Sequence, residues 1–226
     1  MNNNQSRPDL NWVNGHPMHA MQYGIESIVP DLWNGTKPEL VINGPNKGNV
    51  IWPWLQRIPN AITAAYASAH YGIPAISFAY GSRNGNWSSW NTAKRPRNSR
   101  TYVGLVARLL GELQETHEAG KGLLPPDTYL NVNFPPLSLT CKEVEDFQWV
   151  LAGFAPRGFL DPVPAVEWCG KQTLPSEYKT LHSGCYISIA LGNATSMAIL
   201  ADIVAQRNLI NRLGSILSCL PAEKRQ

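Results

Sequence analysis

Hydrophobic positions along the chain follow two spacings, and these predict both helices and strands. Short apolar runs bounded by turn residues are typical of buried strands. Such runs lie at residues 38–43, 73–79, 129–134, 148–154 and 185–191. Apolar or small residues at a spacing of three or four are typical of helices. They occupy residues 20–28, residues 60–71, a stretch that begins at Ser99, and residues 195–213.

Strands and helices alternate over the first two thirds of the chain, which indicates a mostly parallel sheet covered by helices on both faces. Residues 1–20 are rich in asparagine and proline and show no period, so we expect an irregular loop there. A second loop is expected before Ser99. It includes the densest basic cluster, Arg95-Pro96-Arg97 near Arg100, which we interpret as part of a solvated loop.

Length and composition narrow the class of protein. The 226 residues, 43% of them hydrophobic and 15% charged, suffice for one sizeable core, so we expect a single domain over residues 1–226. The formal net charge is +3 and no basic stretch is interleaved with aromatics, which argues against a nucleic-acid polymer as partner. No apolar run reaches the ~20 residues of a membrane span, and the polar N-terminus does not resemble a signal peptide. We therefore expect neither a membrane segment nor an export signal in this chain.

Cysteines and glycosylation sequons leave the cellular compartment open. The chain has 4 cysteines, all in its second half, and Asn-x-Ser/Thr sequons begin at Asn4, Asn34, Asn86 and Asn193. The two features together are typical of secreted proteins. Sequons also arise by chance, and a few thiols are ordinary in a cytosolic protein. Both interpretations therefore stand at this point.

The turn after the strand at residues 38–43 is the most informative stretch. Asn43, Asn46 and Asn49 occur in it among glycine, proline and lysine. Open α/β sheets bind their ligands at the carboxyl ends of the strands, and an asparagine side-chain oxygen can ligate a hard cation. Glycine, proline and asparagine are also the commonest turn residues, so an ordinary turn is the simpler explanation of this stretch taken alone.

The order of several segments is more specific than any one of them. They are residues 12–17 (Trp-Val-Asn-Gly-His-Pro), residues 38–49 (Pro-Glu-Leu-Val-Ile-Asn-Gly-Pro-Asn-Lys-Gly-Asn), an alanine-rich helix, residues 72–77 (Gly-Ile-Pro-Ala-Ile-Ser) and residues 129–135 (Tyr-Leu-Asn-Val-Asn-Phe-Pro). In this order they resemble the SurE survival-protein family of phosphatases and nucleotidases. The resemblance runs over residues 11–136 and is strongest to the fungal-type members, which include secreted acid phosphatases.

The resemblance implies a fold and a function. The implied fold is a Rossmann-like, three-layer α/β/α sandwich with a C-terminal strand and helix extension. The implied function is the hydrolysis of phosphate monoesters, of the 5'-nucleotidase or acid phosphatase type, with a divalent metal, Mg²⁺ or Mn²⁺. The expected partner is thus a small-molecule phosphate ester. The resemblance also implies secretion, and a homodimer to which residues 186–191 and 198–213 contribute.

The resemblance also implies site residues. The family holds its metal with two aspartates of an Asn-Asp-Asp-Gly turn, a serine, and the asparagine of a Ser-Gly-x-Asn turn. Asn46 matches that asparagine and is the expected metal ligand. Asn43 stands where the family has serine. Asn43, Asn49 and Asn60 are the expected substrate or phosphate-binding residues.

The sequence departs from the family's pattern at two places. It contains no Asn-Asp-Asp-Gly segment, so we expect the domain to be incomplete at its N-terminus, without its first strands and the aspartate pair. At residues 59–61 the family's Ser-Gly-Thr phosphate cradle is replaced by Pro-Asn-Ala, which removes two hydroxyls and one backbone N–H. The alternative function is therefore a non-catalytic remnant or pseudoenzyme, which would serve as a binding or oligomerisation module.

The missing first strand also predicts a structural feature. The strand at residues 40–43 should be central and flanked on one side by residues 75–79. An exposed apolar face or edge should remain where the missing strand would lie.

The cysteines allow two kinds of site. If the protein belongs to the secreted branch of the family, Cys169 and Cys185 are the expected disulfide, with Cys141 and Cys219 left to pair or stay free. A zinc site built from His182, Cys169 and Cys185 is the weaker alternative, because the spacing does not match a recognised zinc-binding pattern.

Overall fold

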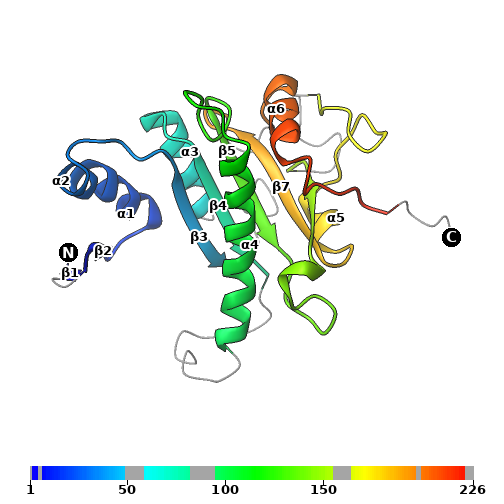
Figure 1. The fold of residues 1–226 in the computed structure, drawn as a ribbon, viewed down its shortest axis with the longest axis horizontal. Helices are drawn as coiled ribbons and strands as arrows, with labels where there is room; N and C mark the ends of the chain where they lie inside the picture. Colours follow the sequence, from blue (N-terminus) through cyan, green and yellow to red (C-terminus); the bar gives the residue numbers. More distant parts are fainter. Residues whose placement is uncertain are drawn as a thin grey trace.

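A five-stranded mixed sheet forms the centre of the molecule (Figure 1). The computed structural model describes residues 2–4, 7–48, 59–81, 95–154, 164–196 and 200–221. The strands lie in the order β3 (Val41–Lys47), β4 (Ala75–Tyr80), β5 (Thr128–Phe134), β7 (Tyr186–Asn193) and β6 (Gln148–Leu151). β3, β4 and β5 are parallel to one another, β7 is antiparallel to β5, and β6 is parallel to β7.

Helices cover the sheet on both faces. α4 (Arg95–Glu115) crosses the near face in Figure 1, and α6 (Ile203–Leu213) packs on the same side. α3 (Pro59–Tyr71) and the short α5 (Glu177–Leu181) pack on the opposite face. The predicted α/β/α sandwich is therefore confirmed.

The alternation of side chains along β4 explains the two packing faces. Ile76 and Phe78 join the core cluster under α4. Ala75 and Ala79 point the other way, because successive residues of a strand face opposite sides. They meet the buried alanines of α3, which are Ala64, Ala65 and Ala67. Small residues on both elements let α3 lie close to the sheet, as the alanine-rich segment predicts.

Regular structure replaces the irregular loop expected over residues 1–20. β1 (Asn2–Asn4) and β2 (Arg7–Trp12) form an antiparallel pair. A continuous helical segment follows, made of α1 (Pro17–Tyr23), the π-helical turn η1 (Gly24–Ile28) and α2 (Val29–Leu32). The predicted helix at residues 20–28 is confirmed within this segment. The loop prediction is wrong because β2 is largely exposed and so carries no apolar period.

Two predicted helix starts are also corrected. α4 begins at Arg95, so the basic cluster expected in a loop lies in its first turns. Pro96 is compatible with this start because the first turn of a helix needs no N–H from it. The last helix begins at Ile203 rather than at residue 195. The Asp202 side chain accepts a hydrogen bond from the Ala205 N–H at 2.8 Å and caps the helix there.

β3 lies at one edge of the sheet that the described residues form. Within the described residues, no strand pairs with its outer edge, and Ile42 is 46% exposed. The predicted exposed apolar edge is therefore confirmed. The predicted central position is wrong, since β4 is the one neighbour that the described chain supplies to β3.

Disulfides join Cys141 to Cys185, with the Cα atoms 5.4 Å apart, and Cys169 to Cys219, with the Cα atoms 5.8 Å apart. The predicted bridge between Cys169 and Cys185 is wrong, and the zinc alternative fails because both of its cysteines are oxidised. The topology explains the first pair. β5 and β7 are antiparallel neighbours, so the loop that leaves β5 lies beside the start of β7.

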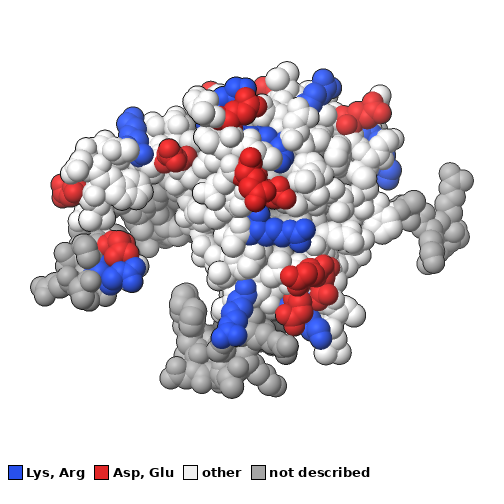
Figure 2. Space-filling view, viewed as in Figure 1, with Lys and Arg blue, Asp and Glu red and all other residues white. Residues whose placement is uncertain are grey.

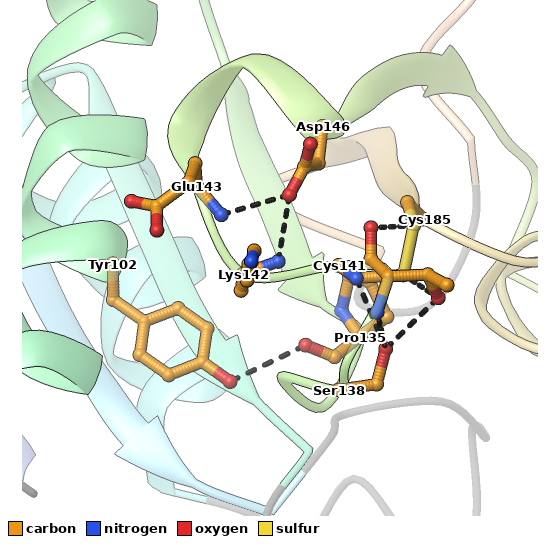
Figure 3. Close-up of a disulfide and its surroundings, with 9 residues drawn as sticks. Tyr102, Pro135, Ser138, Cys141, Lys142, Glu143, Asp146 and Cys185 are labelled. Carbon is orange, nitrogen blue, oxygen red and sulfur yellow. Dashed lines mark hydrogen bonds between the residues drawn. A yellow bond between two sulfur atoms is a disulfide. The ribbon is translucent and has the colours of Figure 1, made fainter.

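Short-range hydrogen bonds hold the loop that carries Cys141 (Figure 3). The Cys141 N–H donates to Ser138 Oγ at 3.0 Å. Asp146 Oδ2 accepts from the backbone N–H groups of Glu143 and Lys142, each at 2.9 Å. These backbone donors lower the pKa of Asp146 from its ordinary value, because they favour the charged carboxylate.

Charges of both signs are mixed on the face that Figure 2 shows. Acidic and basic side chains alternate over this face, and neither sign forms a continuous area. Among the described residues, no helix combines the length and the apolar character that crossing a membrane requires.

Candidate functional site

A bulge in β3 positions two of the asparagines predicted from the sequence. Asn43 lies opposite Ser77 of β4, and Asn46 lies opposite Ala79. Three steps along β3 therefore match two steps along β4. On a regular strand, residues three apart face opposite sides of the sheet. The extra residue instead turns Asn43 and Asn46 to the same face, the one covered by α3.

Gly44 makes this bulge possible. Its φ angle is +102°, which residues with a side chain rarely adopt. A Cβ atom at this position would also lie 2.1 Å from the carbonyl oxygen of Phe78 on β4. Beyond the bulge the strand returns to β4, and the Gly48 N–H donates to the Tyr80 carbonyl oxygen at 2.9 Å. Glycine at position 44 is therefore required by both backbone conformation and space.

Replacing Gly44 by alanine is expected to lower the free energy of unfolding by about 3 kcal/mol, because the new methyl group overlaps a backbone atom that cannot move away alone. Gly48→Ala is the matched control. Gly48 also has a positive φ of +98°, but no atom of the described residues lies within 4 Å of its Cβ position. The control should cost about 1 kcal/mol. Urea unfolding of both variants checks the difference, and equal losses would contradict the close approach of β3 to β4.

Two further asparagines continue the polar surface across the sheet. Asn131 of β5 lies opposite Ser77, and Asn133 lies opposite Ala79, so both share the face of Asn43 and Asn46. We refer to Asn43, Asn46, Asn131 and Asn133 as the amide row. Asn131 and Asn133 are fully buried, whereas Asn43 and Asn46 are half-buried at the open edge. The amide row thus runs from the interior of the sheet to its exposed edge.

Glu177 of α5 anchors the buried end of the amide row. Its carboxylate oxygen Oε1 accepts hydrogen bonds from the side-chain amides of Asn131 at 2.8 Å and Asn133 at 3.1 Å. The residue is fully buried. Ser176 caps α5, accepting a hydrogen bond from the Lys179 N–H at 3.2 Å, and so fixes the start of the helix. One carboxylate therefore orients two amides of the row.

The N-terminus of α3 lies near the carboxyl ends of β3 and β4, the same end of the sheet as Asn43 and Asn46. Residues 72–74 alone separate the end of α3 from the start of β4, so α3 runs antiparallel to the strands. Asn60 is the second residue of α3 and belongs to its first turn. Asn49 lies outside the described residues. The positive end of a helix attracts anions, so this arrangement is suited to a negatively charged ligand.

The donors at this edge do not by themselves suit a divalent cation. Hard cations take about six oxygen ligands, with carboxylates prominent among them. Asn43 and Asn46 offer neutral amides, and Glu177 is directed to Asn131 and Asn133. In the part of the chain that the structure describes, no group of three or more His, Cys, Asp or Glu side chains could hold a metal ion. These residues therefore do not form a complete metal site.

The exposed end of the amide row was predicted from the sequence, whereas its buried end was not. Asn131 and Asn133 served only as part of a strand motif, and Glu177 was not singled out. The Ser77 and Ser188 hydroxyls also lie buried on strands of this face, without a hydrogen-bond partner among the described residues. A signal for Asn131 and Asn133 was present, since polar residues alternate with apolar ones inside an otherwise apolar strand. Glu177 carries no comparable signal, because it lies more than forty residues away in sequence.

Comparisons with known proteins agree on one family. The family model described as "Survival protein SurE" matches residues 2–155. An acid phosphatase of Yarrowia lipolytica is 27% identical over 127 residues, which are 55% of this chain and 34% of the relative. A 5'-nucleotidase SurE of Geobacter metallireducens is 30% identical over 133 residues, which are 59% of this chain and 44% of the relative. The chain thus spans less than half the length of these relatives.

A solved structure has the same fold. The crystal structure of the SurE protein from Aquifex aeolicus aligns with a TM-score of 0.51 at 20% sequence identity. The alignment covers 80% of this chain and 68% of that one. At this identity the likeness concerns the fold alone.

Proposed function

The chain belongs to the Survival protein SurE family, and on this premise we propose that it serves in the hydrolysis of phosphate monoesters. Relatives named acid phosphatase and 5'-nucleotidase SurE support this reaction class. A small-molecule phosphate ester is the proposed substrate.

The bulge of β3 is the observation that carries the proposal. It brings Asn43 and Asn46 to one face, at the edge where the N-terminus of α3 begins. Hydrolysis of a phosphate monoester needs donors for the nonbridging oxygens while water attacks phosphorus and the ester oxygen leaves with a proton. The amide N–H groups of Asn43, together with Asn49 and Asn60, are proposed as these donors. The backbone N–H groups of the first turn of α3 would add to them, although Pro59 contributes none.

A divalent cation, Mg²⁺ or Mn²⁺, is a further part of the proposal. Asn46 would be the one ligand that the described residues contribute. Because the described donors are neutral amides, the remaining oxygens would come from outside the described residues. When bound, such a cation would neutralise phosphate charge.

A phosphate-release assay tests the reaction class. The chain would be joined to an upstream segment that carries Asn-Asp-Asp-Gly, and Ser-Gly-Thr would replace residues 59–61. We expect this completed protein to release phosphate from a nucleoside 5'-monophosphate and from an aryl phosphate, and only with Mg²⁺ or Mn²⁺ present. No release from either ester, in a protein whose circular dichroism shows a folded state, would contradict the proposal.

A non-catalytic binding or oligomerisation module is the second candidate function. The absence of a carboxylate cluster among the described residues and the open edge of β3 favour it. A homodimer remains a prediction under both functions. β7 is paired on both of its edges and so has no free edge for a second copy. We therefore propose that α6 contributes to the dimer contact, and its Val204 is 78% exposed.

A further inference from the structure

The sequon at Asn34 lies at an exposed helix end. Asn34 follows α2 and has a φ of +50°, and the next residue, Gly35, has a φ of +78°. The Gly35 N–H donates to the Pro30 carbonyl at 3.0 Å and the Thr36 N–H to the Trp33 carbonyl at 2.9 Å, so the turn is held by its backbone. The Asn34 and Thr36 side chains are exposed and form no hydrogen bond with other described residues. Both groups that define the sequon are therefore open to solvent.

Asn193 offers a comparison within the same chain. It ends β7, and it is half-buried. Its side-chain oxygen accepts three hydrogen bonds, from the Thr195 N–H at 2.9 Å, the Thr195 hydroxyl at 2.7 Å and the Ser196 N–H at 2.9 Å. The neighbouring Ala194 is buried. In the folded chain the Asn193 side chain and the Thr195 hydroxyl of this sequon are therefore hydrogen-bonded to each other.

The disulfides supply an independent observation. Both bridges are closed and no free cysteine occurs among the described residues. Disulfides persist in oxidising compartments, above all in the secretory pathway. That pathway is also where asparagine sequons on protein surfaces receive oligosaccharides. The bridges and the open sequon therefore point to the same cellular route.

We propose that Asn34 is an N-linked glycosylation site and that the protein passes through the secretory pathway. In the transfer, Asn34 Nδ2 forms a bond to the anomeric carbon of an oligosaccharide carried on a lipid diphosphate. The bond between that carbon and the diphosphate oxygen breaks, the lipid diphosphate leaves with the electron pair, and the amide loses one proton. The folded structure accommodates the product because Asn34 projects from a turn on the surface.

The test uses the full chain behind a cleavable export signal in a eukaryotic host that performs N-linked glycosylation. Protein is taken both from the medium and from the secretory membranes, so that slow export does not hide the result. Enzymatic removal of the glycan in H₂¹⁸O converts a glycosylated asparagine into ¹⁸O-labelled aspartate, which peptide mass spectrometry detects. We expect label at Asn34 in the majority of copies and clearly less at Asn193.

Three variants test whether the glycan depends on the whole Asn-x-Ser/Thr sequon. Asn34→Gln and Thr36→Ala should each remove one glycan, seen as one step of gel mobility, whereas Thr36→Ser should retain it. Closed disulfides in every variant, measured by thiol titration, show that the fold is kept. An unlabelled Asn34 in the disulfide-bonded protein would overturn the proposal, and so would label at Asn193 equal to or above that at Asn34.

Discussion

Replacing Glu177 by alanine is expected to lower the free energy of unfolding by about 4 kcal/mol. The carboxylate is fully buried, and its Oε1 accepts amide hydrogen bonds from both Asn131 and Asn133. Removing it takes this acceptor away from two buried donors, and it leaves a cavity between α5 and the sheet. Each of these changes costs free energy in the folded state but not in the unfolded one.

Two variants serve as controls for this loss. Glu177→Gln keeps an acceptor oxygen at the same place and should cost about 1–2 kcal/mol, the value of exchanging a charged for a neutral hydrogen-bond partner. Glu167→Ala changes an exposed glutamate and should alter stability by less than about 0.5 kcal/mol. Urea unfolding followed by far-UV circular dichroism measures all three. If Glu177→Ala were as mild as Glu167→Ala, Glu177 would not anchor the amide row.

The sheet and its covering helices could be predicted because burial leaves a period in the sequence. β4 and β5 are fully buried along almost their whole length, and both were identified as apolar runs. β2 was missed because its exposed side chains impose no such period. The start of α6 was misplaced for a different reason. It depends on one capping hydrogen bond from the Ala205 N–H to Asp202, which hydrophobic spacing does not reveal.

The candidate site could be predicted where it is local in sequence. Asn43 and Asn46 lie three positions apart in the sequence, and the resemblance to the family identifies both. Their common face could not be predicted, since it depends on a bulge that changes the register against β4. The hydrogen bonds of Glu177 could not be predicted either, because Asn131 and Asn133 lie 46 and 44 positions away from it in the sequence. The disulfide pairing was mistaken for the same reason, because it is the strand order that decides which cysteines meet.

The chain as given is expected to hydrolyse phosphate monoesters at least ~100-fold more slowly than a version completed with an Asn-Asp-Asp-Gly segment and with Ser-Gly-Thr at residues 59–61. The sequence has no two adjacent aspartates, and Pro-Asn-Ala at residues 59–61 provides neither hydroxyl of the family's cradle. Removing a single preorganised donor commonly costs that factor, and here several are absent together. Equal rates of phosphate release by the two proteins would contradict this expectation.

Phosphate release by matched variants of the completed protein tests most directly whether the bulge of β3 carries the site. Asn46→Ala removes the proposed metal ligand, and Asn208→Ala changes an exposed asparagine on α6 as a control. Rates are measured with Mg²⁺ or Mn²⁺ and a nucleoside 5'-monophosphate, after urea unfolding has shown that all variants are equally stable. The result we predict is loss of activity, by ~100-fold or more, in Asn46→Ala and an unchanged rate in Asn208→Ala. An Asn46→Ala variant that keeps the full rate would show that the chemistry takes place elsewhere.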